Sequence, residues 1–427
     1  MGGHLRYRMN SCYQPKARPA KSMANSLESR ELARTVVLCF LVALCEGFDI
    51  QAAGIAAAGL RHELHPSPQV LGFFFSAIGA GLFLGALIGG RASDLLGRKP
   101  VFVASIAAFG LCCLLTSFAP DMLSLIATRF LAGLGLGGAM PNLIALATDA
   151  SGPSHRSGSM AAAYIGLPLG GVVASLFVSA LPLDSWRLVF QVGGIAPLVL
   201  VPLIIRYLPA TRREADLVPG ANLRATAMQV LFGKGRTATT GLLWVAFFLI
   251  VLTLHLMLNW LPLLLMGRGL SGSYAVLSQA AFSIGAALTG LAVGSLLDSR
   301  WKRAAITVSV VALPAILLVT ATCPPWVGLL MALAFLLGGS ITSEQIIILA
   351  VIGARYDIAS RGTATGAAVA VGRMGSLVGP LVAGMLLAAG RSPAQVMIGI
   401  LPIVLVGGAS VALLGWRNLA PSNAHGH

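Results

Sequence analysis

The sequence predicts an all-α integral membrane protein, with twelve transmembrane helices arranged as two pseudo-symmetric six-helix halves. Hydrophobic residues make up 57% of the 427 residues, charged residues only 10%, and the mean hydropathy is +0.86. Soluble domains carry about a quarter charged residues, so this composition excludes an ordinary soluble fold. Apolar runs of about 18 or more residues can cross a bilayer as helices. Twelve such runs lie near residues 35–60, 70–90, 101–119, 122–147, 159–181, 188–207, 239–266, 275–297, 304–322, 326–353, 362–389 and 395–415.

A polar and basic segment separates the first six runs from the last six. The stretch before the first run is basic, contains prolines and lacks apolar periodicity, so we expect it to be disordered. The translation start is left open between Met1 and Met23. The first apolar run is long and has no cleavage site, so we expect it to be kept as a helix and not removed as a signal peptide. The expected parts are a basic cytoplasmic tail (1–34), an N-terminal bundle (35–207), a cytoplasmic linker (208–237), a C-terminal bundle (238–416) and a second cytoplasmic tail (417–427).

Basic residues are distributed unevenly between the two sides of the predicted bundle. They concentrate in the tail, the linker and alternate short loops. The opposite side carries Arg61, Arg187, Arg268 and Arg391. Because basic loops stay on the cytoplasmic side, both termini are expected there, in a multi-pass protein of the cytoplasmic (inner) membrane. The net charge of +15 is therefore a topology signal and does not indicate nucleic-acid binding.

One loop motif recurs in both halves. Gly90-x-x-x-Asp94-x-x-Gly97-Arg98-Lys99 follows the second run, and a reduced copy, Gly294-x-x-x-Asp298, follows the eighth. The copies lie about 200 residues apart, which indicates a duplicated six-helix unit. Transporters built from parallel repeats bind substrate between the repeats near the membrane midplane. We expect Gly90, Asp94, Gly97, Arg98 and Asp298 to act in gating between the halves.

The first run carries two acids, Glu46 and Asp49, at its middle. A carboxylate at the bilayer centre costs about 2.5–3.5 kcal/mol on insertion scales, so such acids usually have a function. Their i, i+3 spacing places them on one helix face. Burial raises a carboxyl pKa and a nearby cation lowers it, so a site that alternates between wet and closed can load and release a proton. We expect this face to line the path, with Asp49 as the main carrier and Glu46 as a relay or second titrating group. The plainer interpretation is a buried ion pair.

Two arginines also fall within predicted spans. Arginine keeps its charge, and its planar fork binds a carboxylate bidentately. Arg129 is expected either to neutralise Asp49 or to bind substrate, and Arg373 is expected to bind a substrate carboxylate. Three consecutive phenylalanines at 73–75 cover three helix faces, so most of them are expected to face lipid. Further candidates for substrate binding are the intramembrane residues Gln51, Asn142, His255, Asn259, Trp260, Glu344 and Gln345.

The Gly90–Lys99 loop and the twelve spans resemble the major facilitator superfamily, although Leu95 replaces a residue that is often basic there. Glu46-Gly47-Phe48-Asp49 is similar to the acidic motif of its aromatic acid/proton symporters. The strings CEGFDIQAAGIAAAG, MPNLIALATDASGP, LNWLPLLL and AVAVGRMG resemble the 3-hydroxyphenylpropionate transporter branch. The resemblance implies the major facilitator fold and import of an aromatic carboxylate, 3-hydroxyphenylpropionate-like or hydroxybenzoate-like, together with protons by alternating access.

The alternative is a proton antiporter that exports drugs or aromatic compounds. The pattern Gly166-x-Pro168-x-Gly170-Gly171 only partly resembles the antiporter motif of exporters in the superfamily, which argues against export. An enzyme is not expected, because no motif combines a nucleophile, a base and an orienting group. The six cysteines show no metal-binding spacing, and we expect no cofactor or metal. The expected partners are the small aromatic carboxylate, protons and the lipid bilayer, around a monomer.

Overall fold

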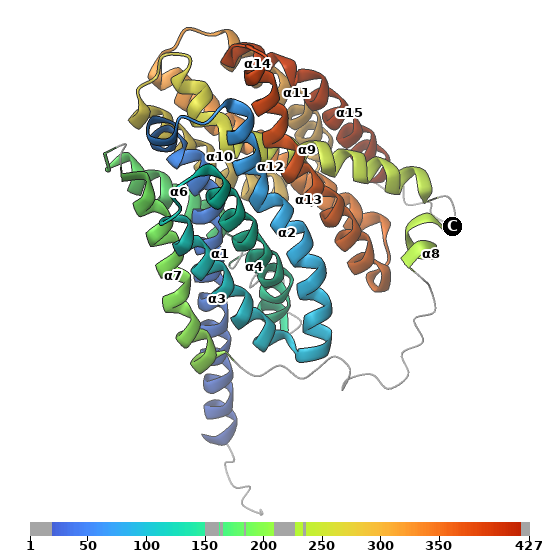
Figure 1. Ribbon diagram of the computed structural model, residues 1–427. Coiled ribbons are helices and arrows are strands. Elements are labelled where there is room, and N and C mark those ends of the chain that lie inside the picture. Colours follow the sequence, from blue (N-terminus) through green and yellow to red (C-terminus); the bar gives the residue numbers. More distant parts are fainter. Residues whose placement is uncertain are drawn as a thin grey trace, which may run out of the picture.

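The computed structural model describes residues 19–149, 162, 165–182, 185–208, 227–233 and 236–419. The secondary structure of this part of the chain is helical and contains no strand (Figure 1). Eleven helical segments are long and apolar enough to span a membrane, and α6 is a shorter apolar helix. The helices are α1 Pro19–Leu64, α2 Pro68–Leu96, α3 Arg98–Thr116, α4 Met122–Asp149, α6 Gly166–Ser179, α7 Trp186–Tyr207, α8 Ala227–Phe232, α9 Thr237–Met266, α10 Gly272–Leu297, α11 Lys302–Thr322, α12 Val327–Arg355, α13 Ile358–Ala388, α14 Pro393–Gly399 and α15 Leu401–Asn418. The all-α membrane fold is confirmed.

Helix α1 begins earlier than predicted. Residues 19–34, expected to be disordered, continue the first membrane helix back to Pro19, so that expectation is wrong for them. Alanine, leucine, glutamate and arginine there are good helix formers, and extending an existing helix avoids the cost of nucleation. Residues 1–18 lie outside the described part of the chain, as do most of the linker and the start of the predicted fifth span.

Two helix boundaries follow from local residues. The helix break inside the twelfth run falls at Ile400, where α14 gives way to α15 and Pro402 removes a backbone donor. Gly97 separates α2 from α3 with φ +92°, a backbone conformation that residues with a side chain rarely adopt. The positive φ therefore explains why the loop motif has a glycine at this position.

Within each half, small residues bring helices into close contact. A Cβ atom added to Gly81 of α2 would lie 2.1 Å from the Phe130 carbonyl oxygen of α4. In the second half, a Cβ on Gly285 of α10 would lie 1.9 Å from the Phe335 carbonyl oxygen of α12. Glycine at these positions permits backbone contact between membrane helices. The pair α2 and α4 in the first half and the pair α10 and α12 in the second half are thus both in close backbone contact, as expected for a duplicated unit.

The two halves contact each other toward one end of the bundle. A Cβ on Gly79 of α2 would lie 2.9 Å from the Ser376 carbonyl of α13, and one on Gly384 would lie 2.8 Å from the Pro68 oxygen. Toward the opposite end, the positions of Gly90 and Gly366 have no atom within 4 Å. Helices α2 and α13 lie side by side and diverge toward that end (Figure 1). We call these the closed end and the open end.

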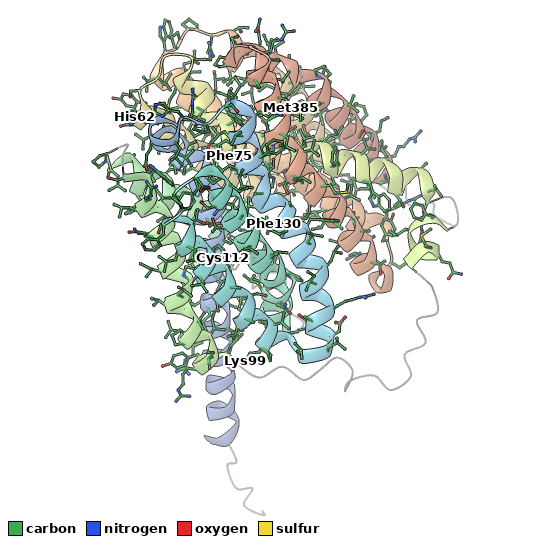
Figure 2. All side chains as sticks on the ribbon, viewed as in Figure 1. His62, Phe75, Lys99, Cys112, Phe130 and Met385 are labelled. Carbon is green, nitrogen blue, oxygen red and sulfur yellow. The ribbon has the colours of Figure 1, made fainter. Side chains whose placement is uncertain are left out.

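The labelled side chains identify the two ends. His62 and Met385 lie toward the closed end, whereas Lys99 lies near the open end (Figure 2). Lys99 belongs to the basic loop motif, and its Nζ donates a hydrogen bond to the Ile205 carbonyl at the end of α7. The open end therefore carries the loops that the charge distribution predicts to be cytoplasmic.

Candidate functional site

Asp49 and Arg129 form a buried ion pair inside the first half. The Arg129 Nη1 atom lies 2.6 Å from Asp49 Oδ1, and its Nη2 donates to the Asp49 carbonyl oxygen at 3.1 Å. Both side chains are completely buried. Of the two roles predicted for Arg129, this geometry matches neutralisation of Asp49.

The pair has two further neighbours. The Cys113 thiol of α3 donates to Asp49 Oδ1 at 3.1 Å, and the Arg129 guanidinium lies over the Phe190 ring of α7 at 5.4 Å. Asp49 Oδ2 and Arg129 Nε have no hydrogen-bond partner in the described part of the chain. One carboxylate oxygen therefore accepts two donors, and the other accepts none from the described residues.

Glu46 has a different environment from Asp49. It is 1% exposed, and neither of its carboxyl oxygens has a hydrogen-bond partner among the described residues. Arg373 of α13 is within electrostatic reach of Glu46 without forming an ion pair. At about 100° per residue, positions i and i+3 differ by about 60° around a helix, which is enough to direct them to different neighbours. Asp49 therefore faces Arg129 of its own half, whereas Glu46 lies within electrostatic reach of Arg373 in the other half.

Arg373 of α13 is half-buried. Its guanidinium forms no hydrogen bond or ion pair that involves a described residue, and it also lies within electrostatic reach of His255 of α9. The His255 Nδ1 atom lies 3.1 Å from the Val251 carbonyl oxygen, one turn earlier. Asn259 donates to the His255 carbonyl at 2.7 Å and leaves its own Oδ1 without a partner. Arg373 and the unpaired Asn259 oxygen thus belong to α13 and α9, two helices that pack against the first half.

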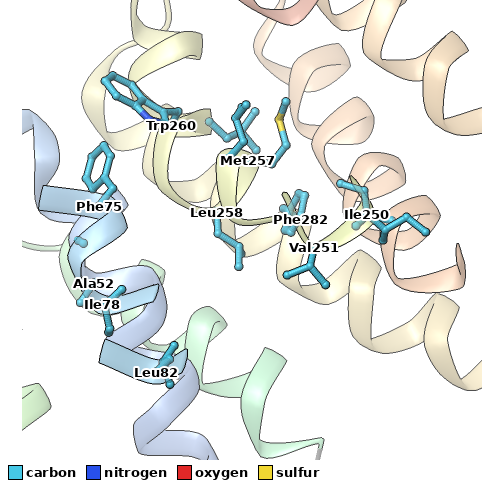
Figure 3. Close-up of a cluster of buried hydrophobic side chains, with 14 of the residues drawn as sticks. Ala52, Phe75, Ile78, Leu82, Ile250, Val251, Met257, Leu258, Trp260 and Phe282 are labelled. Atoms are coloured by element: carbon cyan, nitrogen blue, oxygen red, sulfur yellow. The ribbon is translucent and has the colours of Figure 1, made fainter. Parts of the chain in front are cut away.

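Trp260 joins three helices at the closed end. Its indole nitrogen donates to the Pro380 carbonyl of α13 at 2.9 Å, and its ring meets the edge of Phe75 of α2 at a centroid distance of 5.1 Å (Figure 3). Phe74 and Phe75 are buried, and only Phe73 of the three is exposed. The expectation that most of this run faces lipid is wrong, because α2 packs between α4 and α13. Trp260 acts here as a contact between the halves.

Gln51 also lies between the halves. Its side-chain oxygen accepts hydrogen bonds from Gln279 at 3.2 Å and from Ser283 at 3.0 Å, both on α10. Its amide fills the space beside Gly171 of α6, where a Cβ would lie 1.7 Å from the amide nitrogen. In this conformation the side-chain oxygen of Gln51 is used in a latch formed by Gln51, Gln279 and Ser283.

The remaining predicted substrate residues lie apart from Arg373 or have no specific contact. Asn142 donates to Gly138 and accepts from Ser93 of α2, so its amide is satisfied within the first half. Glu344 has no hydrogen-bond partner among described residues, and it approaches Gly408 of α15, where a Cβ would lie 3.7 Å from Oε1. Gln345, its neighbour on α12, is partly exposed.

The predicted gating residues lie at the open end. Gly90 and Asp94 belong to the last turns of α2, Arg98 begins α3, and Asp298 follows α10. Residues 150–161 lie outside the described part of the chain. The gating role of Asp94, Gly97, Arg98, Gly90 and Asp298 remains a prediction.

Two functional neighbours were missed from the sequence. Cys113 and Ser283 were not among the predicted site residues, although Cys113 contacts Asp49 and Ser283 contacts Gln51. Small weakly polar side chains in apolar runs carry little pattern of their own, so only the fold reveals their partners. Among the described residues, no cluster of three or more His, Cys, Asp or Glu side chains could hold a metal ion.

Comparison with known proteins decides the family. Residues 39–327 match the family described as the Major Facilitator Superfamily. The chain belongs to the major facilitator superfamily. It is a multi-pass membrane transporter, as the sequence motifs predicted, and not an enzyme.

This major facilitator protein is similar to transporters that are named for aromatic acids. It is 40% identical over 392 residues to the 3-(3-hydroxy-phenyl)propionate transporter of Escherichia coli K12, which covers 91% of this chain and 95% of the relative. It is 30% identical over 392 residues to the gallate transporter of Pseudomonas putida, with 83% and 85% covered.

Solved structures support the fold. A bacterial homologue of the human lysosomal transporter Spinster, inward-facing and unoccupied, superposes with a TM-score of 0.75 at 15% identity, over 91% of this chain and 98% of the other. A D-xylose-proton symporter gives 0.72 at 16% identity, over 90% and 97%. The major facilitator fold predicted from the sequence is confirmed.

Proposed function

We propose that this protein is a proton-coupled secondary transporter that imports an aromatic carboxylate by alternating access, in the cytoplasmic membrane with both termini in the cytoplasm. The relatives named above carry 3-(3-hydroxyphenyl)propionate and gallate, which are both aromatic acids. The substrate class proposed here is 3-hydroxyphenylpropionate-like or hydroxybenzoate-like.

The observation that carries the proposal is the unpaired, half-buried Arg373 at the interface of the halves. An uncompensated charge inside a membrane bundle is costly, so such a group usually serves a substrate or ion path. Its planar fork fits a carboxylate with two parallel hydrogen bonds. Substrate sites in parallel-repeat transporters lie between the repeats, where Arg373 is found. Arg373 is therefore the proposed carboxylate site.

Glu46 is the proposed proton-coupling partner of Arg373. It is buried without a hydrogen-bond partner among the described residues, so its negative charge needs either a proton or a nearby cation. A substrate carboxylate on Arg373 competes with Glu46 for the same positive field, which favours a proton on Glu46 when substrate is bound. Asp49, already paired with Arg129, is the second candidate and requires separation of that pair.

The driving force depends on the number of protons. One proton with one monoanion is electroneutral, so the pH gradient alone drives uptake, at about 1.4 kcal/mol per pH unit. A second proton adds the membrane potential, about 2.3 kcal/mol per 100 mV.

The test is uptake of labelled hydroxyphenylpropionates, hydroxybenzoates and cinnamates by cells expressing the protein, with and without a protonophore. We expect accumulation of at least one acid and its loss with the protonophore. Accumulation that survives the protonophore contradicts proton coupling. Exclusion of the acids from energised cells indicates the alternative, a proton antiporter.

Two substitutions separate substrate binding from coupling. Arg373→Gln is expected to abolish uptake and exchange, and Arg373→Lys to restore part of it, because lysine keeps the charge but loses the fork. Glu46→Gln is expected to retain exchange of internal for external substrate while losing proton-driven accumulation. Loss of exchange in Glu46→Gln would place Glu46 in substrate binding instead.

A further inference from the structure

A cavity that the transport path does not use lies at the open end of the second half. It is formed between the start of α9 and the ends of α12 and α15, and its lining includes Thr239, Leu242, Arg355, Leu413, Arg417 and Asn418. No residue predicted for substrate, proton or gating lines it.

The cavity lies at one membrane boundary. The candidate span of α9 begins at Thr237, that of α12 ends at Arg355, and the last one ends at Asn418. Trp416, beside the cavity, is 46% exposed. Tryptophan is enriched where a bundle meets the head groups of the bilayer. The cavity is therefore placed where lipid head groups meet acyl chains.

Two cations line the cavity without an acidic partner. Arg355 and Arg417 are exposed, and neither forms an ion pair or hydrogen bond with a described side chain. The acid nearest to Arg355 along the chain, Asp357, pairs with Arg236 at 3.3 Å. The cavity therefore presents unneutralised positive charge.

The other walls are apolar. Leu242 of α9 and Leu413 of α15 line the same cavity, and Leu413 is 47% exposed. A ligand that satisfies the whole site needs an anionic group for the arginines and an apolar part for the leucines. A guanidinium pairs bidentately with a phosphate, and basic pockets between membrane helices on the cytoplasmic side suit anionic head groups.

We propose that this cavity binds an anionic phospholipid of the leaflet at the open end. Its phosphate lies between Arg355 and Arg417, and an acyl chain follows Leu242 and Leu413. A soluble phosphate ester shares the anionic chemistry but leaves the leucines uncovered. Because α9 also carries His255 and Trp260, the lipid stabilises the starting turn of a helix that contributes to the interface between the halves.

The plainer explanation is that both arginines serve topology alone. Each lies in the last turn of its helix, where a cation is favoured by the helix dipole. In that case any basic pair at this end has the same effect on lipid binding. Arg300, between α10 and α11, and Arg303, in the first turn of α11, are exposed and do not line the cavity, so they provide the matched pair.

The experiment titrates the detergent-purified full chain with phosphatidylglycerol and counts bound lipid by native mass spectrometry. One arginine near an anionic surface changes the binding constant by about fivefold. We expect Arg417→Gln to weaken phosphatidylglycerol binding about fivefold and Arg355→Gln/Arg417→Gln about 25-fold by the same scale. The control Arg300→Gln/Arg303→Gln should bind like wild type, and so should the charge-conserving Arg355→Lys/Arg417→Lys within a fewfold.

Separate arms identify the ligand. Phosphatidylcholine, inorganic phosphate and glycerol 3-phosphate are titrated in the same way, and each should bind far more weakly than phosphatidylglycerol. Equal loss in the control pair, or phosphatidylcholine binding as tightly, overturns the site. Inorganic phosphate competing at equal concentration overturns the lipid as its ligand. If the double variant does not fold, Arg417→Gln measured against Arg300→Gln decides the result.

Discussion

The pair formed by Asp49 and Arg129 gives the sharpest prediction for this protein. Arg129→Gln removes the cation and leaves the Asp49 carboxylate buried without compensation. Asp49→Asn removes the anion and leaves the guanidinium in the same position. Both side chains are fully buried, so solvent cannot screen the charge that remains.

The structure sets the size of the effect. Arg129 donates two charge-assisted hydrogen bonds to Asp49, at 2.6 and 3.1 Å. Such bonds contribute about 1.5–3 kcal/mol each, and breaking a buried pair typically costs about 3–5 kcal/mol. We expect each single variant to lose about 3–5 kcal/mol of unfolding free energy. The double variant leaves no buried charge and should be more stable than either single variant.

The assay is a double-mutant cycle on the free energy of unfolding, measured by titrating sodium dodecyl sulfate into detergent micelles. The control is Arg187→Gln, which breaks the partly exposed ion pair with Glu63. Exposed pairs contribute at most about 1 kcal/mol, so this loss should be small. Additive losses in the Asp49 and Arg129 cycle would refute the coupling, as would a control loss of equal size.

Three further predictions concern the interface and the unused acid. The first uses the double variant Gly72→Cys/Gly384→Cys, because a Cβ on Gly384 would lie 3.1 Å from the Gly72 Cα. Oxidation should cross-link the closed end and stop uptake until a reductant is added. Uptake by the cross-linked protein would contradict alternating access. Gln51→Leu removes two hydrogen bonds worth about 0.5–1.5 kcal/mol each, so it should lower the yield of that cross-link, and an unchanged yield would show that the latch does not hold the halves together. Glu344→Gln should retain uptake, because Glu344 approaches Gly408 of α15, whereas loss of uptake equal to that of Arg373→Gln would place Glu344 on the path.

The apolar runs and loop motifs determined most of the fold. Hydrophobic length sets the membrane spans because the bilayer leaves no water for an unpaired backbone, and basic loops set their expected orientation. The close contact of α2 with α4, where Gly81 lies against Phe130, came from the structure. The boundary of α1 was missed because a polar extension of a helix has no apolar signal.

The candidate site was only partly predictable. The sequence showed that Glu46, Asp49, Arg129 and Arg373 are charged groups inside spans, since the cost of burying charge makes them stand out in an apolar run. It did not show how they pair, because residues three apart on a helix can face different neighbours.

The tertiary structure alone decided those partners. It directs Asp49 to Arg129 within one half, leaves Arg373 unpaired at the interface, and places Gln51 in a latch with α10. Composition and periodicity determine that a helix enters the membrane and which of its groups are costly there. Rotation of each helix and its approach to helices distant in sequence determine which of these groups meet, because close packing and charge neutralisation are satisfied between helices and not along one.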